Sequence, residues 1–453
     1  MRDLTLGNEG RVILKFAGPM LIGNVFQQLY NVINAIVVGQ FIGKEALAAV
    51  GASFPIIFML VSFIIGITMG STIIISQYFG AGDLKRVKKS IDTLYIFLFF
   101  GSIIISILGI AFSNFIFKLT GLPDDIRPQA VLYLNIFLSG SIFFFGFNGT
   151  SAILRGLGDS KTPLVFLVIS TLMNIGLDLL FVLVFKWGIA GVAISTLISQ
   201  GGAFFTAIIY LNRTHDIVKF SIKNMEFDSE IFKKSVKIGL PSGLQQTFVA
   251  MGMLALFGIV NKFGTEAIAA FSVAGRIDSF ASIPAMNFAA ALSTFVGQNL
   301  GANKPERVRK GFAATLWMTS IFSVLVTITI YFFGSSLMRL FTNDPNIVAI
   351  GHEYLVIVSS FYILFSGMFT VGAVMRGAGD TLIPMFITLF ALWLIRIPIS
   401  WFLSRHIGIT GVWWGIPIAW GIGMFFSYIY YKTGKWKSKV VVKYPVIEEV
   451  LPE

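Results

Sequence analysis

The sequence predicts an all-α integral membrane protein with twelve transmembrane helices, arranged as two pseudosymmetric lobes of six helices each. Of its 453 residues, 56% are hydrophobic and only 12% are charged, and the mean hydropathy is +0.83. Soluble domains have about a quarter charged residues. The apolar residues gather in stretches long enough to cross a bilayer, which takes about 20 residues. An internal repeat relates the two halves of the chain.

Short polar breaks separate the apolar stretches and set the order of the spans. We expect spans near 12–40, 47–79, 91–119, 130–154, 162–186, 189–211, 235–261, 267–300, 311–340, 349–375, 381–404 and 409–431. Residues 1–212 then form an N-terminal lobe and residues 235–432 a C-terminal lobe. Residues 213–234 are the predicted cytoplasmic linker, and residues 433–453 are a cytoplasmic tail.

The distribution of basic residues predicts the orientation. Most of the 34 Lys and Arg residues fall in alternate loops, which include clusters at 85–89 and 304–310, the linker and the tail. By the positive-inside rule these loops and both termini are cytoplasmic. Membrane topology therefore accounts for the net charge of +12, and we expect no nucleic-acid partner. The first apolar stretch contains Pro19 and several amides, so we expect no cleaved signal peptide.

Two motifs establish the repeat. The segment ILRGLGDSKTP at 153–163 returns as VMRGAGDTLIP at 374–384, 221 positions later. The segment that begins at Gly43 returns at Gly264 with the same spacing. Each copy holds six spans, an even number, so the two lobes share one orientation and are related by an axis along the membrane normal. We interpret the Arg155–Asp159 and Arg376–Asp380 segments as structural turns, with a gate or hinge as the alternative.

A duplicated bundle of this kind is typical of secondary transporters, whose halves rock about a site between them. The sequence has no cysteine and no Walker A motif, and its three histidines have neither metal-ligand nor triad spacing. We therefore expect a transporter and not an enzyme, with no cofactor. A channel or a scaffold would not need two lobes that rock.

Polar residues inside the first lobe indicate a cation site. Asp178 and Asn174 lie one turn apart on the fifth span, and Asn34 and Thr196 lie at a compatible depth on the first and sixth spans. Their oxygens suit a monovalent cation such as Na⁺, and a buried carboxyl can instead carry a proton. We expect Asp178 to be the coupling residue. The alternative is that these side chains only join helices. The repeat places Ala255 and Pro417 opposite Asn34 and Thr196, so the second lobe has no copy of this site.

Other embedded side chains are candidates for the cavity or for packing. We expect cavity-lining or substrate-binding residues among the amides of the first span, a glutamine of the sixth and two methionines of the seventh: Asn24, Gln27, Gln28, Asn31, Gln200, Met251 and Met253. Arg276, Asp278 and Arg396 are buried charges in the second lobe. We favour an ion pair that fixes helix packing over substrate contact for these three.

Together these residues resemble the multidrug and toxic compound extrusion (MATE) family over essentially the whole chain. The resemblance rests on Gln27-Gln-Leu-Tyr-Asn31 with Val38-Gly39, on both Arg-Gly-x-Gly-Asp turns, on Asn174 with Leu177-Asp178, on Gly275-Arg-Ile277 and on Arg396-Ile-Pro398. It implies a V-shaped central cleft and export of amphipathic, often cationic compounds in exchange for Na⁺ or H⁺. It also implies a monomer in a prokaryotic cell membrane.

One position departs from the family pattern. Prokaryotic MATE proteins usually carry an aspartate on the first helix where this chain has Asn34. An amide oxygen can coordinate Na⁺ but cannot carry a proton near neutral pH, so the departure places the coupling role on Asp178. A flippase of lipids or lipid-linked oligosaccharides from the same superfamily is the alternative. It would have a more strongly charged central cavity and often extra spans, and the twelve-span count argues against it.

Overall fold

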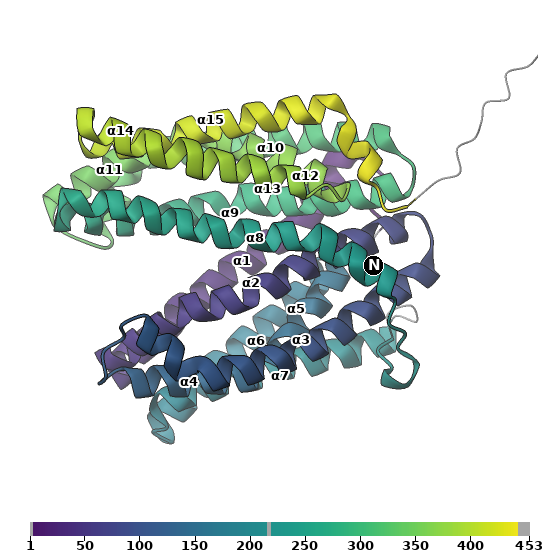
Figure 1. The fold of residues 1–453 in the computed structure, drawn as a ribbon, viewed down its shortest axis with the longest axis horizontal. Coiled ribbons are helices and arrows are strands. Elements are labelled where there is room, and N and C mark those ends of the chain that lie inside the picture. Colours follow the sequence, from purple (N-terminus) through teal and green to yellow (C-terminus); the bar gives the residue numbers. More distant parts are fainter. Residues whose placement is uncertain (1–2, 215–218, 443–453) are drawn as a thin grey trace, which may run out of the picture.

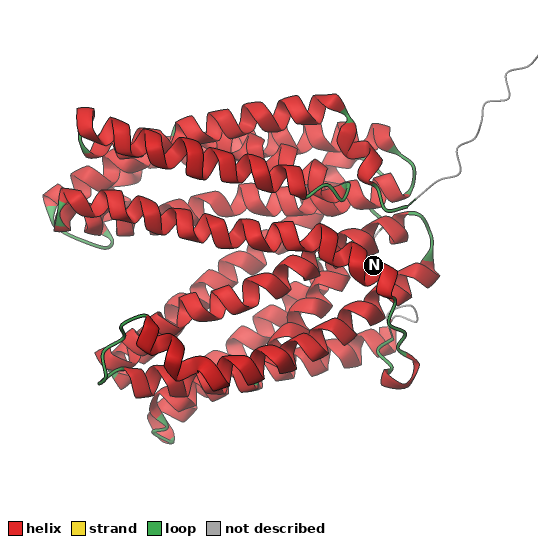
Figure 2. Cartoon of the chain, viewed as in Figure 1, coloured by secondary structure: helices red, strands yellow, loops and turns green. Residues whose placement is uncertain are grey.

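The computed structural model describes residues 3–214 and 219–442 of the chain, and within these ranges every regular element is a helix (Figures 1 and 2). The first half of the chain contains α1 (Glu9–Val37), η1 (Val38–Ile42), α2 (Lys44–Gly80), α3 (Leu84–Leu119), α4 (Arg127–Ser139), α5 (Ser141–Gly156), α6 (Lys161–Leu179), η2 (Leu180–Val184) and α7 (Gly188–Thr214).

The second half repeats this order. It contains η3 (Ile222–Asn224), α8 (Ser229–Val260), η4 (Asn261–Phe263), α9 (Thr265–Gly301), α10 (Pro305–Arg339), α11 (Pro345–Ser359), α12 (Tyr362–Gly377), α13 (Leu382–Leu389), η5 (Phe390–Arg396), α14 (Ile397–Ile407), α15 (Ile409–Thr433) and η6 (Lys435–Lys439). Across both halves, three elements are π-helical turns that continue the preceding helices: η1, η2 and η5.

The described residues form ten helices that are long and apolar enough to cross a membrane. Two further spans are bent pairs, α4 with α5 at 52° and α11 with α12 at 49°, which bring the number to twelve. The prediction of an all-α membrane protein with twelve spans is therefore confirmed when each bent pair counts as one span.

The two bends occur at equivalent places in the repeat and are stabilised in the same way. Ser106 on α3 donates a hydrogen bond to the carbonyl of Leu138 at 2.5 Å, at the end of α4. Thr327 on α10, 221 positions after Ser106, donates to the carbonyl of Ser359 at 2.6 Å, at the end of α11. A hydroxyl from a neighbouring helix thus satisfies a carbonyl at each break, which is one recognised cause of helix kinks.

The helices form two bundles that diverge toward the left of Figure 1 and converge toward the right, where both ends of the described chain lie. Glycines allow this close approach. A Cβ atom on Gly70 of α2 would lie 2.3 Å from the carbonyl oxygen of Ser235 on α8. A Cβ atom on Gly66 would lie 2.7 Å from the main chain of Gly243. Small residues permit such backbone contact between membrane helices.

A reciprocal pair of glutamines joins the bundles at the converging end. Gln77 on α2 donates to the carbonyl of Gly377 at 2.9 Å, and Gln298 on α9 donates to the carbonyl of Gly156 at 2.9 Å. Both side chains are fully buried. Their oxygens accept hydrogen bonds from residues near both limits of the described ranges, from Val441 N at 2.7 Å and from Leu4 N at 2.9 Å. We call these four hydrogen bonds the glutamine lock.

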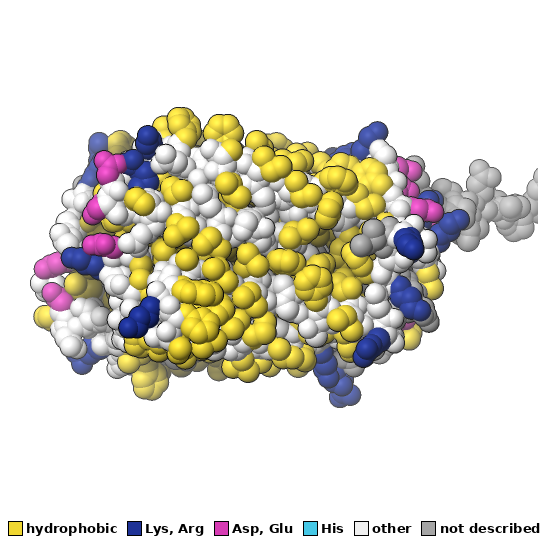
Figure 3. Space-filling model, turned by 90° about the horizontal axis from the view of Figure 1, so that it is seen from below, with side chains coloured by type: hydrophobic (Ala, Val, Ile, Leu, Met, Phe, Trp, Pro, Cys, Tyr) yellow, Lys and Arg dark blue, Asp and Glu magenta, His cyan; other side chains and the backbone are white. Residues whose placement is uncertain are grey.

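The surface has the polarity of a membrane protein. Hydrophobic side chains cover the middle of the face in Figure 3, and charged side chains gather at its two ends. Large apolar side chains such as Trp317 and Phe332 are more than two-thirds exposed. An apolar belt of this kind is stable only against lipid, because contiguous apolar patches of this size are rare on soluble monomers.

Candidate functional site

The four residues predicted to bind a cation lie together between α1, α6 and α7. Asp178 and Asn174 on α6 are 1% and 2% exposed. The hydroxyl of Ser195 on α7 donates a hydrogen bond to Asp178 Oδ1. A buried carboxylate needs such partners, because an uncompensated charge in a membrane is costly.

Asn174 connects Asp178 to Thr196. In the amide orientation that satisfies both of its atoms, the nitrogen of Asn174 donates to Asp178 Oδ2 at 3.0 Å. In that orientation its oxygen accepts from the backbone N–H of Thr196, also at 3.0 Å. The amide therefore fixes the carboxylate of α6 relative to the backbone of α7.

Tyr30 brings α1 into the same network. Its hydroxyl lies 3.3 Å from Thr196 Oγ1, and it accepts a hydrogen bond from Asn34 Nδ2 at 3.4 Å. The amide oxygen of Asn34 is buried and has no hydrogen-bond partner among the described residues. This oxygen, together with those of Asp178 and Thr196, provides the ligand types that a hard monovalent cation prefers. That these residues bind a cation stays a prediction.

Sequence reasoning missed two members of this network, Tyr30 and Ser195. Tyr30 precedes Asn34 by one helical turn and so shares its face, and Ser195 directly precedes Thr196. Helical spacing could have found Tyr30. It could not have found Ser195, whose side chain reaches Asp178 only through the way α6 and α7 pack.

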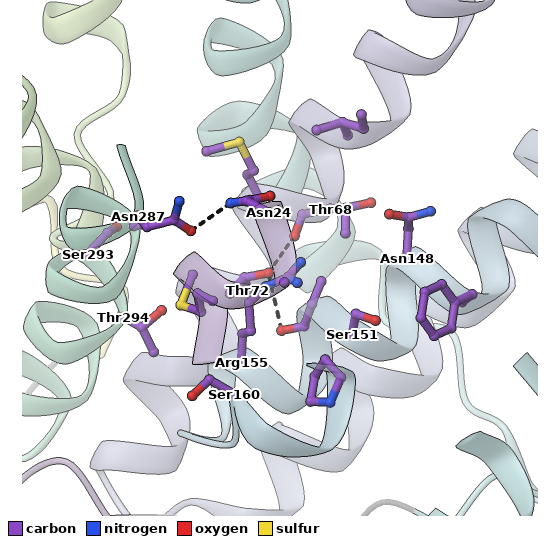
Figure 4. Close-up of a pocket in the computed structure, with 18 of the residues that line it drawn as sticks. Asn24, Thr68, Thr72, Asn148, Ser151, Arg155, Ser160, Asn287, Ser293 and Thr294 are labelled. Atoms are coloured by element: carbon purple, nitrogen blue, oxygen red, sulfur yellow. Dashed lines mark hydrogen bonds between the residues drawn. The ribbon is translucent and has the colours of Figure 1, made fainter. Parts of the chain in front are cut away.

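A central cavity of about 500 Å³ lies between the two bundles (Figure 4). Asn24 and Gln27 of α1 and Gln200 of α7 line it, and that they bind substrate stays a prediction. Asn24 Nδ2 donates to Asn287 Oδ1 on α9 at 2.7 Å, which joins the two halves across the cavity. The other four candidates, Gln28, Asn31, Met251 and Met253, are not among its lining residues. Asn31 instead donates to Gln28 at 3.2 Å.

The cavity has a feature that the sequence did not reveal. Arg155 of α5 and Arg376 of α12, which belong to the two repeated turns, both line it. In Figure 4, Arg155 lies among the polar side chains of Thr72, Ser151 and Ser160. That the turns are structural stays an interpretation, and each turn also supplies a basic side chain to the cavity.

Comparison with known proteins identifies the family. The model of the MatE family matches residues 19–180 and again residues 241–402, so it covers most of both halves. The chain belongs to the MatE family. It is therefore a membrane transporter of the MATE type and not an enzyme. The two matched segments are of equal length, in agreement with the internal repeat.

Several MATE relatives align over nearly the whole chain. It is 34% identical over 436 residues to "Probable multidrug resistance protein YpnP" of Bacillus subtilis, which covers 96% of this chain and 98% of the relative. It is 27% identical over 450 residues to "Probable multidrug resistance protein NorM" of Thermotoga maritima, covering 97% and 95%. A solved structure described as the outward-facing conformation of a multidrug resistance MATE family transporter matches its fold, with a TM-score of 0.89 at 23% identity and coverage of 96% of this chain and 98% of that one.

The charges of the second lobe of this MATE protein do not form the expected ion pair. Arg276 is exposed and is therefore not a buried charge. Asp278 accepts a hydrogen bond from the hydroxyl of Tyr362 on α12, and within the described ranges no Arg nitrogen lies within 4.0 Å of it. Arg396, which is 9% exposed, acts on Asp278 only through its charge. A phenol hydroxyl can bind a carboxylate without the cost of removing a second charged group from water. The hydrogen bond from Tyr362 therefore takes the place of an ion pair with arginine.

Proposed function

We propose that this MATE protein is a secondary active multidrug efflux antiporter, which exports amphipathic compounds in exchange for Na⁺ or H⁺ by alternating access. The names of its relatives support export of drugs. The observation that carries the exchange mechanism is a buried carboxylate, Asp178, in a hydrogen-bonded network with residues of α1, the helix that also lines the cavity between the two lobes. The lobes are residues 1–212 and 235–432, joined by the linker at 213–234.

Helix α1 links the cation site to the cavity. Tyr30 and Asn34 contact the network around Asp178, whereas Asn24 and Gln27, about one to three turns earlier on the same helix, line the cavity. A cation at Asp178 would attract the unpartnered amide oxygen of Asn34 and so shift α1. That shift changes the bond between Asn24 and Asn287, and so couples cation binding to the lobe contact. Coupling of this kind requires a two-state element that both sites bias.

The glutamine lock closes one end of the cavity in this mechanism. It lies at the end of the molecule where Leu4 and Val441 are found, and by the positive-inside rule this end is cytoplasmic. The conformation is then open away from the cytoplasm. The protein works as a monomer in a prokaryotic cell membrane, with both termini in the cytoplasm and no cofactor.

Proteoliposomes test this function directly. Purified protein is reconstituted, and release of a fluorescent dye is followed while a Na⁺ gradient or an H⁺ gradient is imposed separately. We expect one of the two ion gradients to drive the dye against the concentration gradient of the dye itself. Release driven by Na⁺ alone would favour Asn34 as a ligand, and release driven by H⁺ alone would assign the proton to Asp178. Current that follows voltage without exchange would contradict the antiporter and support a channel.

A further inference from the structure

The charged residues in the described lining of the central cavity are all basic. Its described lining includes the two arginines Arg155 and Arg376 and no aspartate or glutamate. The two residues come from opposite lobes and are equivalent in the repeat, which places a basic side chain on each side of the pseudosymmetry axis. The cavity between the lobes is thus positively charged.

The carboxylates nearest in sequence do not neutralise these arginines. Asp159 accepts hydrogen bonds from the backbone N–H groups of Lys161 and Thr162 at 3.0 Å, and so caps the start of α6. Asp380 accepts a hydrogen bond from the hydroxyl of Tyr430 at 2.6 Å. Within 3–214 and 219–442, neither arginine has a carboxylate oxygen within 4.0 Å.

Few protein groups occupy the guanidinium donors. Arg376 Nη2 lies 3.5 Å from the carbonyl of Phe369, at the limit of a hydrogen bond. A guanidinium offers five N–H donors in a fixed planar fork, which matches carboxylate, sulfonate and phosphate groups. Such charge-assisted bonds are about twice as strong as neutral ones. A cation in the same cavity would meet two like charges with no carboxylate to receive it.

The rest of the lining suits an amphipathic molecule. Hydroxyl and amide donors also line the cavity, at Asn148, Ser151, Ser160, Ser293 and Thr294. Apolar side chains complete the lining, among them Met20, Phe147, Leu164 and Met286. A ligand with one anionic group and an apolar body would satisfy both surfaces.

We propose that the central cavity takes amphipathic compounds that carry an anionic group, with Arg155 and Arg376 as the residues that bind the anion. This inference rests on the proposed efflux function, because it names the substrate class of the same cavity. It replaces the cationic preference that family resemblance implies. The anionic group belongs either to a free small molecule or to the headgroup of an anionic lipid.

A matched pair of dyes tests the charge preference. Fluorescein and rhodamine 123 share a xanthene core but carry opposite charges. Binding of each dye is measured by fluorescence anisotropy in nanodiscs of phosphatidylcholine, and counterflow is measured in proteoliposomes of the same lipid. We expect fluorescein to bind at least about tenfold more tightly than rhodamine 123. We expect Arg155→Gln and Arg376→Gln each to weaken fluorescein binding by about tenfold or more, and Arg155→Lys to retain part of it.

Arg213→Gln is the matched control, because Arg213 is an exposed arginine at the end of α7. This variant should bind fluorescein as the unmodified protein does.

Tighter binding of rhodamine 123 than of fluorescein, or fluorescein binding unchanged in both Arg155→Gln and Arg376→Gln, would overturn the proposal. If fluorescein binds through the arginines but neither dye is transported under any gradient, the efflux function fails and the charge preference stands. Movement of fluorescently labelled phosphatidylglycerol between leaflets, lost in Arg155→Gln, would identify a lipid headgroup as the source of the anion.

Discussion

Gln77 and Gln298 occupy equivalent positions in the two lobes, and each donates a 2.9 Å hydrogen bond to the main chain of the opposite lobe. Their backbones also approach closely. A Cβ atom on Gly80 would lie 1.9 Å from the main-chain oxygen of Gln298, and one on Gly301 would lie 1.9 Å from that of Gln77. The closed end therefore depends on two glycines as well as two glutamines.

We expect Gly80→Ala and Gly301→Ala to separate the ends of α2 and α9 and to shift the protein toward a state open to the cytoplasm. A cysteine introduced at Ser293 in the cavity reports this shift, since the native chain has no cysteine. Labelling by an impermeant maleimide from the cytoplasmic side should be severalfold faster in both variants. Gly258→Ala is the control, because a Cβ atom there has no neighbour within 4 Å. Equal labelling rates in all three proteins would show that the lock does not hold this end closed.

We expect Asp178→Asn to abolish cation-driven transport. The variant keeps the shape of the side chain and removes its charge, so it can neither bind Na⁺ strongly nor carry a proton. Active efflux in proteoliposomes should fall by about 100-fold or more, whereas dye binding in the cavity should change little. Asp125→Asn serves as the control, because Asp125 is an exposed carboxylate of the same lobe. Full activity of Asp178→Asn would remove this residue from the coupling mechanism.

Tyr30→Phe tests whether α1 communicates with the cation site. The variant removes the hydroxyl that lies between Asn34 and Thr196. Loss of such a hydrogen bond typically costs about 1 kcal/mol, so we expect the cation concentration for half-maximal transport to rise about fivefold. Tyr331→Phe, at a tyrosine that is 64% exposed, should leave it unchanged. An unaltered cation dependence in Tyr30→Phe would mean that α1 takes no part through this hydroxyl.

In the second lobe, Tyr362→Phe should affect stability and not coupling. It removes the hydrogen bond that the hydroxyl of Tyr362 donates to Asp278 and leaves Tyr354 as the remaining phenol partner of that carboxylate. Hydrogen bonds to charged groups contribute about 1.5–3 kcal/mol. We expect the midpoint of thermal denaturation to fall by at least about 2 °C, with the cation dependence of transport preserved. A changed cation dependence at normal stability would instead assign this lobe a role in coupling.

The spans were predictable because they depend on local composition. Apolar stretches of sufficient length predict the number of helices, and a repeat in constant register with six spans in each copy predicts that the two lobes share one orientation. The bends at the ends of α4 and α11 were not predictable in the same way, since no proline marks them. They depend on Ser106 and Thr327, which lie on other helices and contact the breaks only after packing.

The candidate site was predictable only where it depends on residues close together in the sequence. Asn174 and Asp178 share a helix face by spacing alone, and Tyr30 could have been placed beside Asn34. The contact of Ser195 with Asp178 requires α6 and α7 to pack at a particular rotation. The position of Arg155 in the cavity was not predictable either. Its turn motif already had a structural interpretation, and the direction of its side chain depends on how the helices pack.

The assignment of ion coupling to one carboxylate, Asp178 of the first lobe, has an electrical consequence. With Asp178 as the coupling group, one cycle of the proposed exchange carries one positive charge inward. Export of a monovalent anion moves a second charge in the same electrical sense. A membrane potential of 100 mV contributes about 2.3 kcal/mol for each charge, so two charges supply about 4.6 kcal/mol, enough for a concentration ratio above about 1,000. A cell that lost its ion gradients but kept its voltage would still expel such a compound.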